Sequence, residues 1–560
     1  MLLRLALAQI NPTVGDLAGN AARIVDFSAR ARAAGADLVL FPEMSLTGYP
    51  PEDLLLEPIF LEECEKALHQ LLPRLPKDLL VVLGLPEGRP GALFNAAVAL
   101  HGGRIRVRFH KWFLPNYGVF DEQRYFLPGQ EPALLDLGGV RIGLTVCEDV
   151  WRPEGPALAA SKAGASLILN LSASPFHAGK GKERVAVLTN KARECGAAIA
   201  YGNLVGGQDE LVYDGSSLVM NAKGRVVAQA PAFDEHLLIT DLPLEPVSLQ
   251  NAKAVKIPRR SEDRAPNTSF LAPPLDPEEE IYSALIVGTR DYVRKNGFGR
   301  VLVGLSGGID SALVAVIAAD ALGKENVVGV TLPSRFNSDE TRNDAEAVAR
   351  NLGIEFHTLP IEETVQSFRK TLAPLFGDRA PDVAEENLQS RVRGTLLMAL
   401  SNKLGWLVLT TGNKSELSAG YFTLYGDSAG GFAVIKDLPK TLVYRLARWR
   451  NARGGRPLIP ETTLTRPPTA ELRPNQRDQD SLPPYEVLDT IVHRYVEENQ
   501  GLERIVKAGV PRQVAAKWIR TIDAMEYKRR QTPPGIKITP RAFGRDRRMP
   551  ITNKFKATGE

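Results

Sequence analysis

Three residues with complementary chemistry follow three separate apolar segments in the first half of the chain. Glu43 lies in FPEMSLTGYPP, Lys111 in RVRFHKWFLPNYG and Cys147 in RIGLTVCEDVW. Each follows or ends a stretch that its pattern predicts to be a strand, so a carboxylate, an ammonium and a thiol can meet at one rim. Such a trio suits attack by a thiolate on the carbon of an amide or a nitrile.

Each of the three side chains has a distinct task in such an attack. A free thiol has a pKa of about 8.5, so only a few per cent of it is thiolate at neutral pH. Glu43 can take the proton of Cys147 as the bond forms, while Lys111 stabilises the developing oxyanion. Alone, a cysteine at a strand end is more often a small buried hydrophobic residue, as we expect for Cys64 and Cys195.

A second candidate site lies in VLVGLSGGIDSALVAVIAADALG, where a buried strand runs into glycines and then a helix. Glycine permits close approach of the backbone to phosphate, and a helix N-terminus offers unpaired N–H groups. Ser306 and Ser311 can add hydroxyl donors, and Asp310 can hold Mg²⁺. An isolated Gly-Gly pair usually marks only a turn, but the complete SGGIDS string favours phosphate binding. The sequence has no GxxxxGK[ST], the common kinase-type phosphate loop.

The composition limits what else the chain can be. It has 560 residues, is 44% hydrophobic and 24% charged, and carries a formal net charge of +4. These values exclude a largely disordered or fibrous protein and give no case for nucleic-acid binding. Three cysteines indicate a reducing compartment rather than a disulfide framework. No long apolar run and no signal-peptide pattern occur, so we expect a cytoplasmic protein without a membrane partner.

The order of predicted elements indicates two α/β domains. In the first half we expect a helix at 21–34 and strands at 3–9, 38–41, 79–84, 141–147, 166–171, 211–220 and 224–229. In the second half we expect helices at 311–321, 339–352 and 386–404, and strands at 301–305, 327–332, 356–359 and 406–410. Strands joined by crossover helices predict a doubly wound parallel sheet in the second half. A stretch rich in proline and charge, 246–275, is predicted to be a linker that lies over the surface. It separates a first domain at 1–245 from a second at 276–560.

The segments around the first trio resemble the glutaminase branch of the nitrilase superfamily. That resemblance implies an α-β-β-α sandwich with Glu43 as proton acceptor, Lys111 as oxyanion-stabilising residue and Cys147 as nucleophile. Glu122, in FDEQRYF, matches a second glutamate beside the triad. LPNYGVF and LNLSASPFHAGKGKER match the part that holds glutamine, through Tyr117, Ser174 and Lys180.

The second half resembles the PP-loop ATP pyrophosphatases, whose fold is that of the adenine nucleotide alpha hydrolases. Companion segments, among them VLTTGNKSELSAGYFTLYGD and RRQTPPGIKITPRAFGRD, resemble NAD synthetases, so nearly the whole chain resembles the glutamine-dependent members. The implied ATP contacts are Gly304, Leu305, Ser306, Gly307, Gly308, Ile309, Asp310, Ser311 and Thr411. The implied contacts with deamido-NAD⁺ are Asn387, Glu416 and Lys528, with Asp310 and Glu416 for Mg²⁺ and Asp437 and Lys440 as further candidates.

The resemblance implies a two-site reaction on small molecules. Ammonia released from L-glutamine would displace AMP from deamido-NAD⁺ adenylated by ATP, giving NAD⁺, pyrophosphate and glutamate. We expect an internal channel, because bulk water would protonate and dilute ammonia. A homo-oligomer is implied by the family alone.

A basic cluster near the C-terminus fits either a solvated surface or a phosphate site. Eight Lys and Arg and one acidic residue occur from Lys528 to Arg548. Proline and glycine interrupt any regular helix there, which favours a loop folded over the nucleotide.

Other amidating and nucleotide-binding proteins fit less well. GMP synthetases use a Cys–His–Glu triad, and none of the seven histidines here has a partner motif. Asparagine synthetases need an N-terminal cysteine, whereas Leu2 follows the initiator. The thiolating PP-loop enzymes use paired cysteines, but none occurs after Cys195. A nucleotide-sensing protein with an inactive amidase half is opposed by the intact trio.

Overall fold

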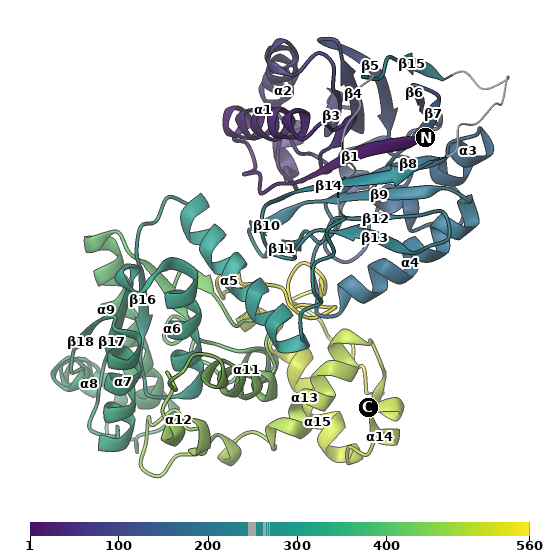
Figure 1. Cartoon of the computed structure of the whole chain (residues 1–560). Helices are drawn as coiled ribbons and strands as arrows, with labels where there is room; N and C mark the ends of the chain where they lie inside the picture. The colour runs from purple at the N-terminus through teal and green to yellow at the C-terminus, as the bar shows by residue number, and fades with distance from the viewer. Residues whose placement is uncertain (245–253, 261–264, 266, 268, 559–560) are drawn as a thin grey trace. The chain divides into compact units, whose positions relative to one another are not determined.

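The computed structural model describes residues 1–244, 254–260, 265, 267 and 269–558. The chain forms two compact units, one of Met1–Gln208 and Val212–Leu275 and one of Asp209–Leu211 and Asp276–Glu560 (Figure 1). Residues 246–253, 261–264, 266 and 268 of the predicted linker lie outside the described residues. The boundaries 1–245, 246–275 and 276–560 remain a proposal.

The N-terminal unit is built on two sheets. In the described part, the first has the order β14-β1-β2-β3-β4-β5 and the second β13-β12-β9-β8-β7-β6-β15. The first sheet comprises β1 (Leu2–Gln9), β2 (Leu38–Leu40), β3 (Leu80–Arg89), β4 (Ala92–His101), β5 (Arg104–His110) and β14 (His236–Pro243). The second comprises β6 (Leu134–Leu137), β7 (Val140–Val146), β8 (Leu167–Ser172), β9 (Ala198–Asn203), β12 (Leu218–Met220), β13 (Val226–Gln229) and β15 (Val255–Ile257). A separate ribbon pairs β10 (Val205–Gln208) with β11 (Leu211–Asp214).

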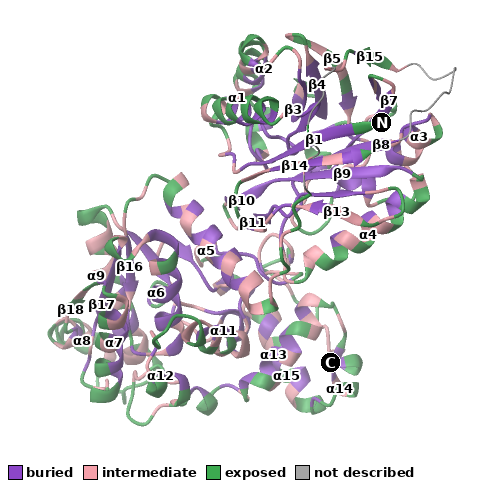
Figure 2. Ribbon diagram, viewed as in Figure 1, coloured by how far each residue is buried: buried purple, intermediate pink, exposed green. Residues whose placement is uncertain are grey.

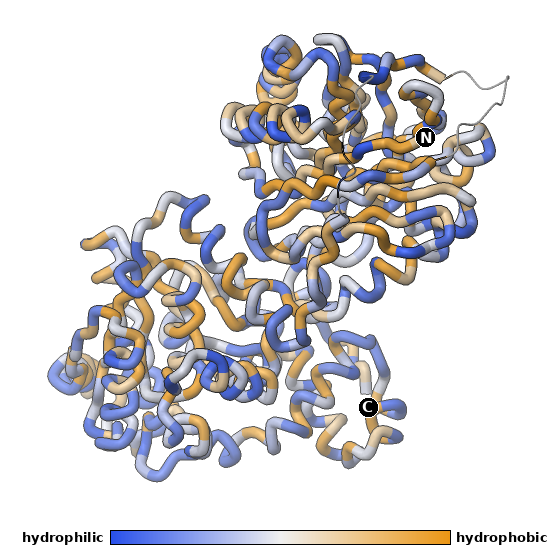
Figure 3. The backbone as a smooth tube through the Cα atoms, viewed as in Figure 1, coloured by the Kyte–Doolittle hydropathy of each residue, from blue (hydrophilic) through white to orange (hydrophobic). Residues whose placement is uncertain are grey.

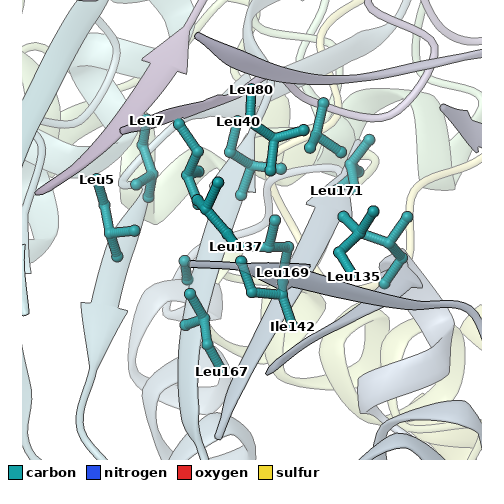
Figure 4. Packing of buried hydrophobic residues seen from close by; sticks show 14 of the residues in the cluster. Leu5, Leu7, Leu40, Leu80, Leu135, Leu137, Ile142, Leu167, Leu169 and Leu171 are labelled. Atoms are coloured by element: carbon teal, nitrogen blue, oxygen red, sulfur yellow. The ribbon is translucent and has the colours of Figure 1, made fainter. Parts of the chain in front are cut away.

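The core of this unit lies between the two sheets. Leu5, Leu7 and Leu40 of the first sheet share one buried cluster with Ile142 and Leu169 of the second (Figure 4). Helices α1 (Leu17–Ala33) and α2 (Pro58–Leu71) cover the first sheet, and α3 (Pro156–Lys162) and α4 (Lys180–Cys195) cover the second. Burial is densest along the strands (Figure 2). The predicted α-β-β-α sandwich is therefore confirmed.

Helix α1 shows how local chemistry sets an element's limits. The pattern predicted a helix at 21–34, but α1 starts at Leu17 because the side chain of Asp16 caps it by accepting from Gly19 N at 2.9 Å. Ile24 and Phe27 are buried on its inner face. The alternation of apolar and polar residues along the helix is visible in Figure 3.

One prediction for the end of this unit is wrong, and the structure adds a strand to another stretch. The stretch 211–220 is not one strand, because Gly215 and Ser216 both have positive φ, 63° and 51°, which ends β11 and starts the separate strand β12. The predicted surface linker contains a strand, since β15 pairs in parallel with β6.

The C-terminal unit contains the predicted parallel sheet, with the order β18-β17-β16-β19-β20 in the described residues. Its strands are β16 (Val301–Gly304), β17 (Val327–Thr331), β18 (Glu355–Thr358), β19 (Leu407–Thr410) and β20 (Phe432–Ala433). The flanking helices include α5 (Pro277–Lys295), α6 (Ile309–Leu322), α7 (Asp339–Leu352), α8 (Glu362–Phe376), α9 (Val383–Leu404), α10 (Lys414–Ala419) and α11 (Lys440–Ala452). Helix α6 follows β16 directly, so its N-terminus lies at the carboxyl edge of the sheet, where ligands bind in this architecture.

The remaining helices follow the sheet in sequence. They are α12 (Glu461–Thr465), α13 (Tyr485–Val492), α14 (Leu502–Lys507), α15 (Arg512–Ala524) and α16 (Glu526–Arg529). Leu488, Ile505 and Ile519 give α13, α14 and α15 a small core of their own. No described helix is long and apolar enough to span a bilayer.

Candidate active sites

The three residues of the first trio meet Glu122 in the interior of the N-terminal unit. Glu43 follows β2, Lys111 follows β5 and Cys147 follows β7. Lys111 Nζ donates to Glu43 Oε1 and to Glu122 Oε1, each at 2.8 Å. All four residues are buried. The ammonium is thus fixed between two carboxylates in a water-poor site.

Two further side chains orient these carboxylates, and the sequence did not single them out. Asn95 Nδ2 donates to Glu43 Oε1 at 2.7 Å, and Tyr49 OH donates to Glu122 Oε1 at 2.8 Å. The backbone N–H of Ala173 donates to Glu43 Oε2 at 2.9 Å. The only signal for Asn95 was a polar residue inside the apolar run LFNAAVAL.

Cys147 starts a short 3₁₀ turn, Cys147–Val150, with a φ of 42°. This left-handed conformation is uncommon for a residue with a side chain and often marks a functional position. The buried carboxylate of Asp149 holds the turn, accepting from Val146 N at 2.9 Å and from Trp112 N and Phe113 N at 3.1 and 3.0 Å. One carboxylate therefore connects the backbone beside Cys147 to the backbone beside Lys111.

The electrostatics of the trio favour a protonated thiol at rest. Burial raises the pKa of Cys147 well above its usual range; Glu43 adds to this and Lys111 opposes it. Burial alone would lower the pKa of Lys111, but Glu122 and Glu43 outweigh it and raise that pKa well above 10.5. A thiol in this state needs a base to take its proton during attack.

Glu122 gives the stability of the protein a testable pH dependence. Burial raises the pKa of Glu122 from 4.5 to about 7, although Lys111 opposes the shift, and its buried Oε2 accepts no hydrogen bond from the described residues. A folded pKa above the unfolded value means that this group's stabilisation is complete below about pH 4.5 and is lost as pH rises through about 7. Glu122→Gln is neutral throughout, so its unfolding temperature relative to wild type should increase between pH 5 and pH 8. A difference that stays constant across that range would contradict the assignment.

The residues expected to hold glutamine lie on three segments of the same unit. Tyr117 is about half exposed and donates to Glu148 Oε2 at 2.8 Å, next to Cys147 in sequence. Ser174 is buried just beyond β8, one residue after the Ala173 that contacts Glu43. Lys180 starts α4, with Nζ 4.1 Å from the ring centroid of Trp151. A polar, partly open region therefore adjoins the buried trio.

A cavity of about 510 Å³ in the C-terminal unit brings together all the residues expected to hold nucleotide except Asp437. All eight residues of the GLSGGIDS segment line it, together with Thr411, Asn387, Glu416 and Lys528. Lys440 also lines it. Asp437 instead accepts backbone N–H groups from Ile538 and Thr539 at 2.8 and 2.7 Å and is not among the lining residues described.

The turn before α6 is held open by its own serines. Ser306 N donates to Ser311 Oγ and Gly308 N to Ser306 Oγ, both at 3.2 Å. Gly307 has a φ of 83°, and a Cβ placed there would lie 2.1 Å from Thr341 O. Only glycine fits this position without moving the backbone.

Gly307→Ala should therefore disturb the turn and leave the rest of the protein folded. We expect the rate of the ATP-dependent reaction that the resemblance implies to fall by at least tenfold, because a shift of about 1 Å at a phosphate-binding turn costs orders of magnitude in rate. Initial rates at varied ATP concentration measure it. Gly299→Ala, at a position with no atom within 4 Å of the added Cβ, is the matched control. Equal rates for the two variants would contradict the role of the turn.

Two carboxylates and two donors form the polar centre of this cavity. Lys440 Nζ pairs with Asp310 Oδ2 and lies 3.3 Å from Glu416 Oε1. Asn413 Nδ2 donates to Asp310 Oδ1 at 3.0 Å. Burial raises the pKa of Glu416 to about 8, with Lys440 opposing and Asp310 adding to the shift. This polar centre is thus poor in water, and its carboxylates and ammonium can contact a cation or a phosphate.

The basic C-terminal cluster as a whole does not line this cavity, so the prediction of a basic nucleotide-binding loop is wrong. Of its eight cations, only Lys528 lines the cavity among the described residues. Three others are buried in ion pairs: Arg529 with Glu526 at 2.9 Å, Lys537 with Asp546 at 2.6 Å and Arg547 with Asp523 at 2.9 Å. Two of these acidic partners precede Lys528 in sequence, so a count that starts at Lys528 overstates the local charge.

Arg393 is a lining residue that the sequence did not single out. Its Nε donates to Leu332 O at 2.9 Å and its Nη2 to Asn337 Oδ1 at 3.2 Å. Burial lowers the pKa of Arg393 to about 10, with Glu471 and Asp427 opposing. It places a cation on α9 facing the cavity, but nothing in RVRG distinguishes it from a surface arginine.

Two family models and several known proteins match this chain. The carbon-nitrogen hydrolase family model matches residues 4–251 and the NAD synthase model residues 281–532. The glutamine-dependent NAD(+) synthetases of Thermotoga maritima and Aquifex aeolicus are 48% and 47% identical, covering 99% of this chain and 99% and 100% of theirs. The solved structure of the Acinetobacter baumannii glutamine-dependent NAD+ synthetase with adenosine diphosphate is 42% identical, covers 99% of both chains and has a TM-score of 0.77. This chain therefore belongs to the family of glutamine-dependent NAD(+) synthetases.

Proposed function

We propose that this protein makes NAD⁺ by ATP-dependent amidation of deamido-NAD⁺, with L-glutamine as the nitrogen source. The observation that carries the proposal is one chain with two sites. One is the buried group of Glu43, Lys111 and Cys147, and the other is the cavity lined by the GLSGGIDS turn. The products are NAD⁺, AMP, pyrophosphate and glutamate, and the step is the last in NAD⁺ biosynthesis.

At the first site, Cys147 attacks the side-chain amide carbon of glutamine. Glu43 takes the thiol proton, which the raised pKa of Cys147 makes necessary. Lys111, held at 2.8 Å by Glu43 and Glu122, offsets the charge on the oxyanion. Collapse releases ammonia and leaves a thioester, which water hydrolyses to glutamate.

Three residues are proposed to hold the glutamine itself. They are Tyr117, Ser174 and Lys180, which come from three segments of the N-terminal unit. Glu122 keeps Lys111 in place and makes no bond to the substrate.

At the second site, the nicotinate carboxylate of deamido-NAD⁺ attacks the α-phosphorus of ATP and pyrophosphate leaves. Ammonia then attacks the acyl adenylate and AMP leaves. The eight turn residues and Thr411 are proposed to hold ATP, while Asn387, Glu416 and Lys528 hold deamido-NAD⁺. Backbone N–H groups at the start of α6 suit the phosphate charge.

The cavity also suits Mg²⁺ bound with the phosphates. Asp310 and Glu416 both line it and supply hard carboxylate oxygens, and Mg²⁺ in nucleotide sites is usually held by one or two carboxylates plus phosphate. Asp310 and Glu416 would hold the ion, which would neutralise charge on the leaving pyrophosphate. Both carboxylates pair with the ammonium of Lys440.

The wider setting is proposed from the sequence pattern and the family resemblance, and the channel from the chemistry of ammonia. Residues 1–245 act as the glutaminase, 246–275 as a linker and 276–560 as the synthetase. A channel for ammonia, a homo-oligomeric assembly and a cytoplasmic location are part of the same proposal. Small molecules are the only other partners expected.

The decisive assay supplies glutamine, ATP, Mg²⁺ and deamido-NAD⁺ and measures NAD⁺, AMP and pyrophosphate. We expect all three products in equal amounts and none without deamido-NAD⁺. A nucleotide-sensing protein would bind ATP without turnover. AMP release that does not depend on deamido-NAD⁺ would refute the substrate assignment.

A further inference from the structure

A buried ion pair in the N-terminal unit lies behind the residues proposed to hold glutamine. Arg184 of α4 donates through Nη1 to Asp214 Oδ2 at 2.8 Å and through Nη2 to Asp214 Oδ1 at 2.6 Å. The two residues are 1% and 3% exposed. Burial alone would lower the pKa of Arg184, but Asp214 outweighs it and raises that pKa. A two-point pair of this kind fixes the orientation of both planar groups.

The pair holds the side chain of Asn203 in one orientation. Asn203 Nδ2 donates to Asp214 Oδ1 at 3.3 Å and to Gly215 O at 2.9 Å. The backbone N–H of Asn203 donates to Ser217 Oγ at 3.0 Å. Because the side-chain amide and the backbone N–H of Asn203 are both hydrogen-bonded, the position of its Oδ1 atom is fixed.

That oxygen accepts a hydrogen bond from the backbone N–H of Ser174 at 3.0 Å. The register of the parallel pair β8–β9 aligns Ser172 with Asn203, so the side chain of Asn203 lies at the strand end from which Ser174 emerges. The neighbouring Ala173 N donates to Glu43. Asn203 therefore sets the direction of the chain one residue beyond its contact with the proposed base.

Arg184 is also connected to Lys180, another residue proposed to hold glutamine, because both lie on helix α4. It lies four residues after Lys180 on α4, one turn further along the same helical face. Ser174 and Lys180, two of the three residues proposed to hold glutamine, are thus both connected to the buried Arg184–Asp214 pair.

We propose that Arg184 and Asp214 are positioning residues for glutamine, acting through Asn203 on Ser174 and through α4 on Lys180. They contact no reacting atom. This inference rests on the proposed glutaminase function and adds to it the part of the protein that sets glutamine affinity.

The inference predicts a kinetic signature that a purely structural role would not produce. Loosening Ser174 and Lys180 weakens substrate and transition state alike, which raises KM and leaves kcat unchanged. The bond from Ala173 to Glu43 does not pass through Asn203, so the chemical step is spared. We expect KM for glutamine to rise about tenfold, a factor that corresponds to about 1.4 kcal/mol.

The test replaces the pair by apolar residues in the full-length protein, Arg184→Met with Asp214→Leu. Exchanging a buried ion pair for apolar side chains of similar size often preserves stability, so we expect this double variant to fold. Ammonia-driven NAD⁺ synthesis and the thermal unfolding temperature verify that the protein is intact. The matched control is Arg4→Met with Asp241→Leu, another buried pair of the same unit with Nε to Oδ1 at 2.6 Å, which should leave KM for glutamine unchanged.

Asn203→Ala provides an independent second variant. It removes the acceptor of Ser174 N directly and should raise KM for glutamine to a similar extent. Combined with the apolar pair, it should add little, because both changes interrupt the same path.

Two results would overturn the inference. One is a KM for glutamine at the wild-type value in the apolar pair and in Asn203→Ala, which would leave the pair a purely structural role. The other is a loss of kcat with KM unchanged. If wild-type protein itself failed to use glutamine while using ammonia, the proposed function would fail instead.

Discussion

Cys147→Ala should abolish glutamine-driven NAD⁺ synthesis and leave ammonia-driven synthesis within about twofold of wild type. The thiol is the nucleophile that lies with Glu43 and Lys111, and removing the nucleophile of a covalent mechanism costs several orders of magnitude in rate. A fall of at least about 1000-fold is expected. The second site lies in the other unit and needs only nitrogen as ammonia.

Cys147→Ala should also leave the fold unchanged. Cys147 has a φ of 42°, which strains any residue with a Cβ by about 1–3 kcal/mol, so alanine inherits the strain without adding to it. The hydrogen bonds of Asp149 that hold the turn use backbone N–H groups and do not involve the thiol. The lost sulfur leaves a small buried gap only.

The comparison is made with glutamine and with ammonium at alkaline pH, where more of the ammonia is unprotonated. Cys195→Ala is the matched control, because Cys195 is a free cysteine of the same unit that ends α4 without Glu43 or Lys111 as a partner. Loss of synthesis with both nitrogen sources would mean that the two halves do not work separately. Full activity with glutamine would remove Cys147 from the mechanism.

The residues most accessible to sequence reasoning are those in dense local motifs. Glu43, Lys111 and Cys147 each follow a strand, and the strand ends fix where they emerge, so their convergence was predictable from the order of elements. The GLSGGIDS turn is likewise local, since Gly307 at a φ of 83° and the start of α6 come from adjacent residues.

The residues that support them were not predictable, because their contacts join distant segments. Asn95 and Glu43 are 52 residues apart, and Tyr49 and Glu122 are 73 apart. Arg184 and Asp214 are 30 apart and carry no motif. An asparagine in an apolar run or an arginine on a helix has many structural explanations, and only packing decides among them.

The same argument explains the wrong strand prediction. Residues 211–220 hold two apolar stretches, LVY and LVM, but the positive φ of Gly215 and Ser216 between them ends β11 and separates it from β12. A Cβ at Gly215 would lie 2.3 Å from the side chain of Gln9, a residue of β1. Close approach by a distant strand therefore decides where β11 ends.

Asp310 is the residue whose loss should affect synthesis from either nitrogen source. It lies in the first turn of α6 and lines the nucleotide cavity, where it pairs with Lys440 and accepts from Asn413. In Asp310→Asn the amide has no charge to hold Mg²⁺ or Lys440, and one of its atoms becomes a donor facing an ammonium. Buried Lys440 then keeps its ion pair with Glu416, at 3.3 Å.

We therefore expect Asp310→Asn to reduce NAD⁺ synthesis by at least about 100-fold with glutamine and with ammonia, since the charge stabilisation at the phosphates is worth several kcal/mol. Glutamate release at the first site, measured separately, should persist. Asp320→Asn is the matched control, because Asp320 lies on the same helix but pairs with Arg450 at 2.7 Å and does not line the cavity. Retained synthesis in Asp310→Asn would remove Asp310 from the ATP site. If Asp320→Asn were equally inactive, the effect would belong to helix α6 as a whole, and the carboxylate at its first turn would have no special role.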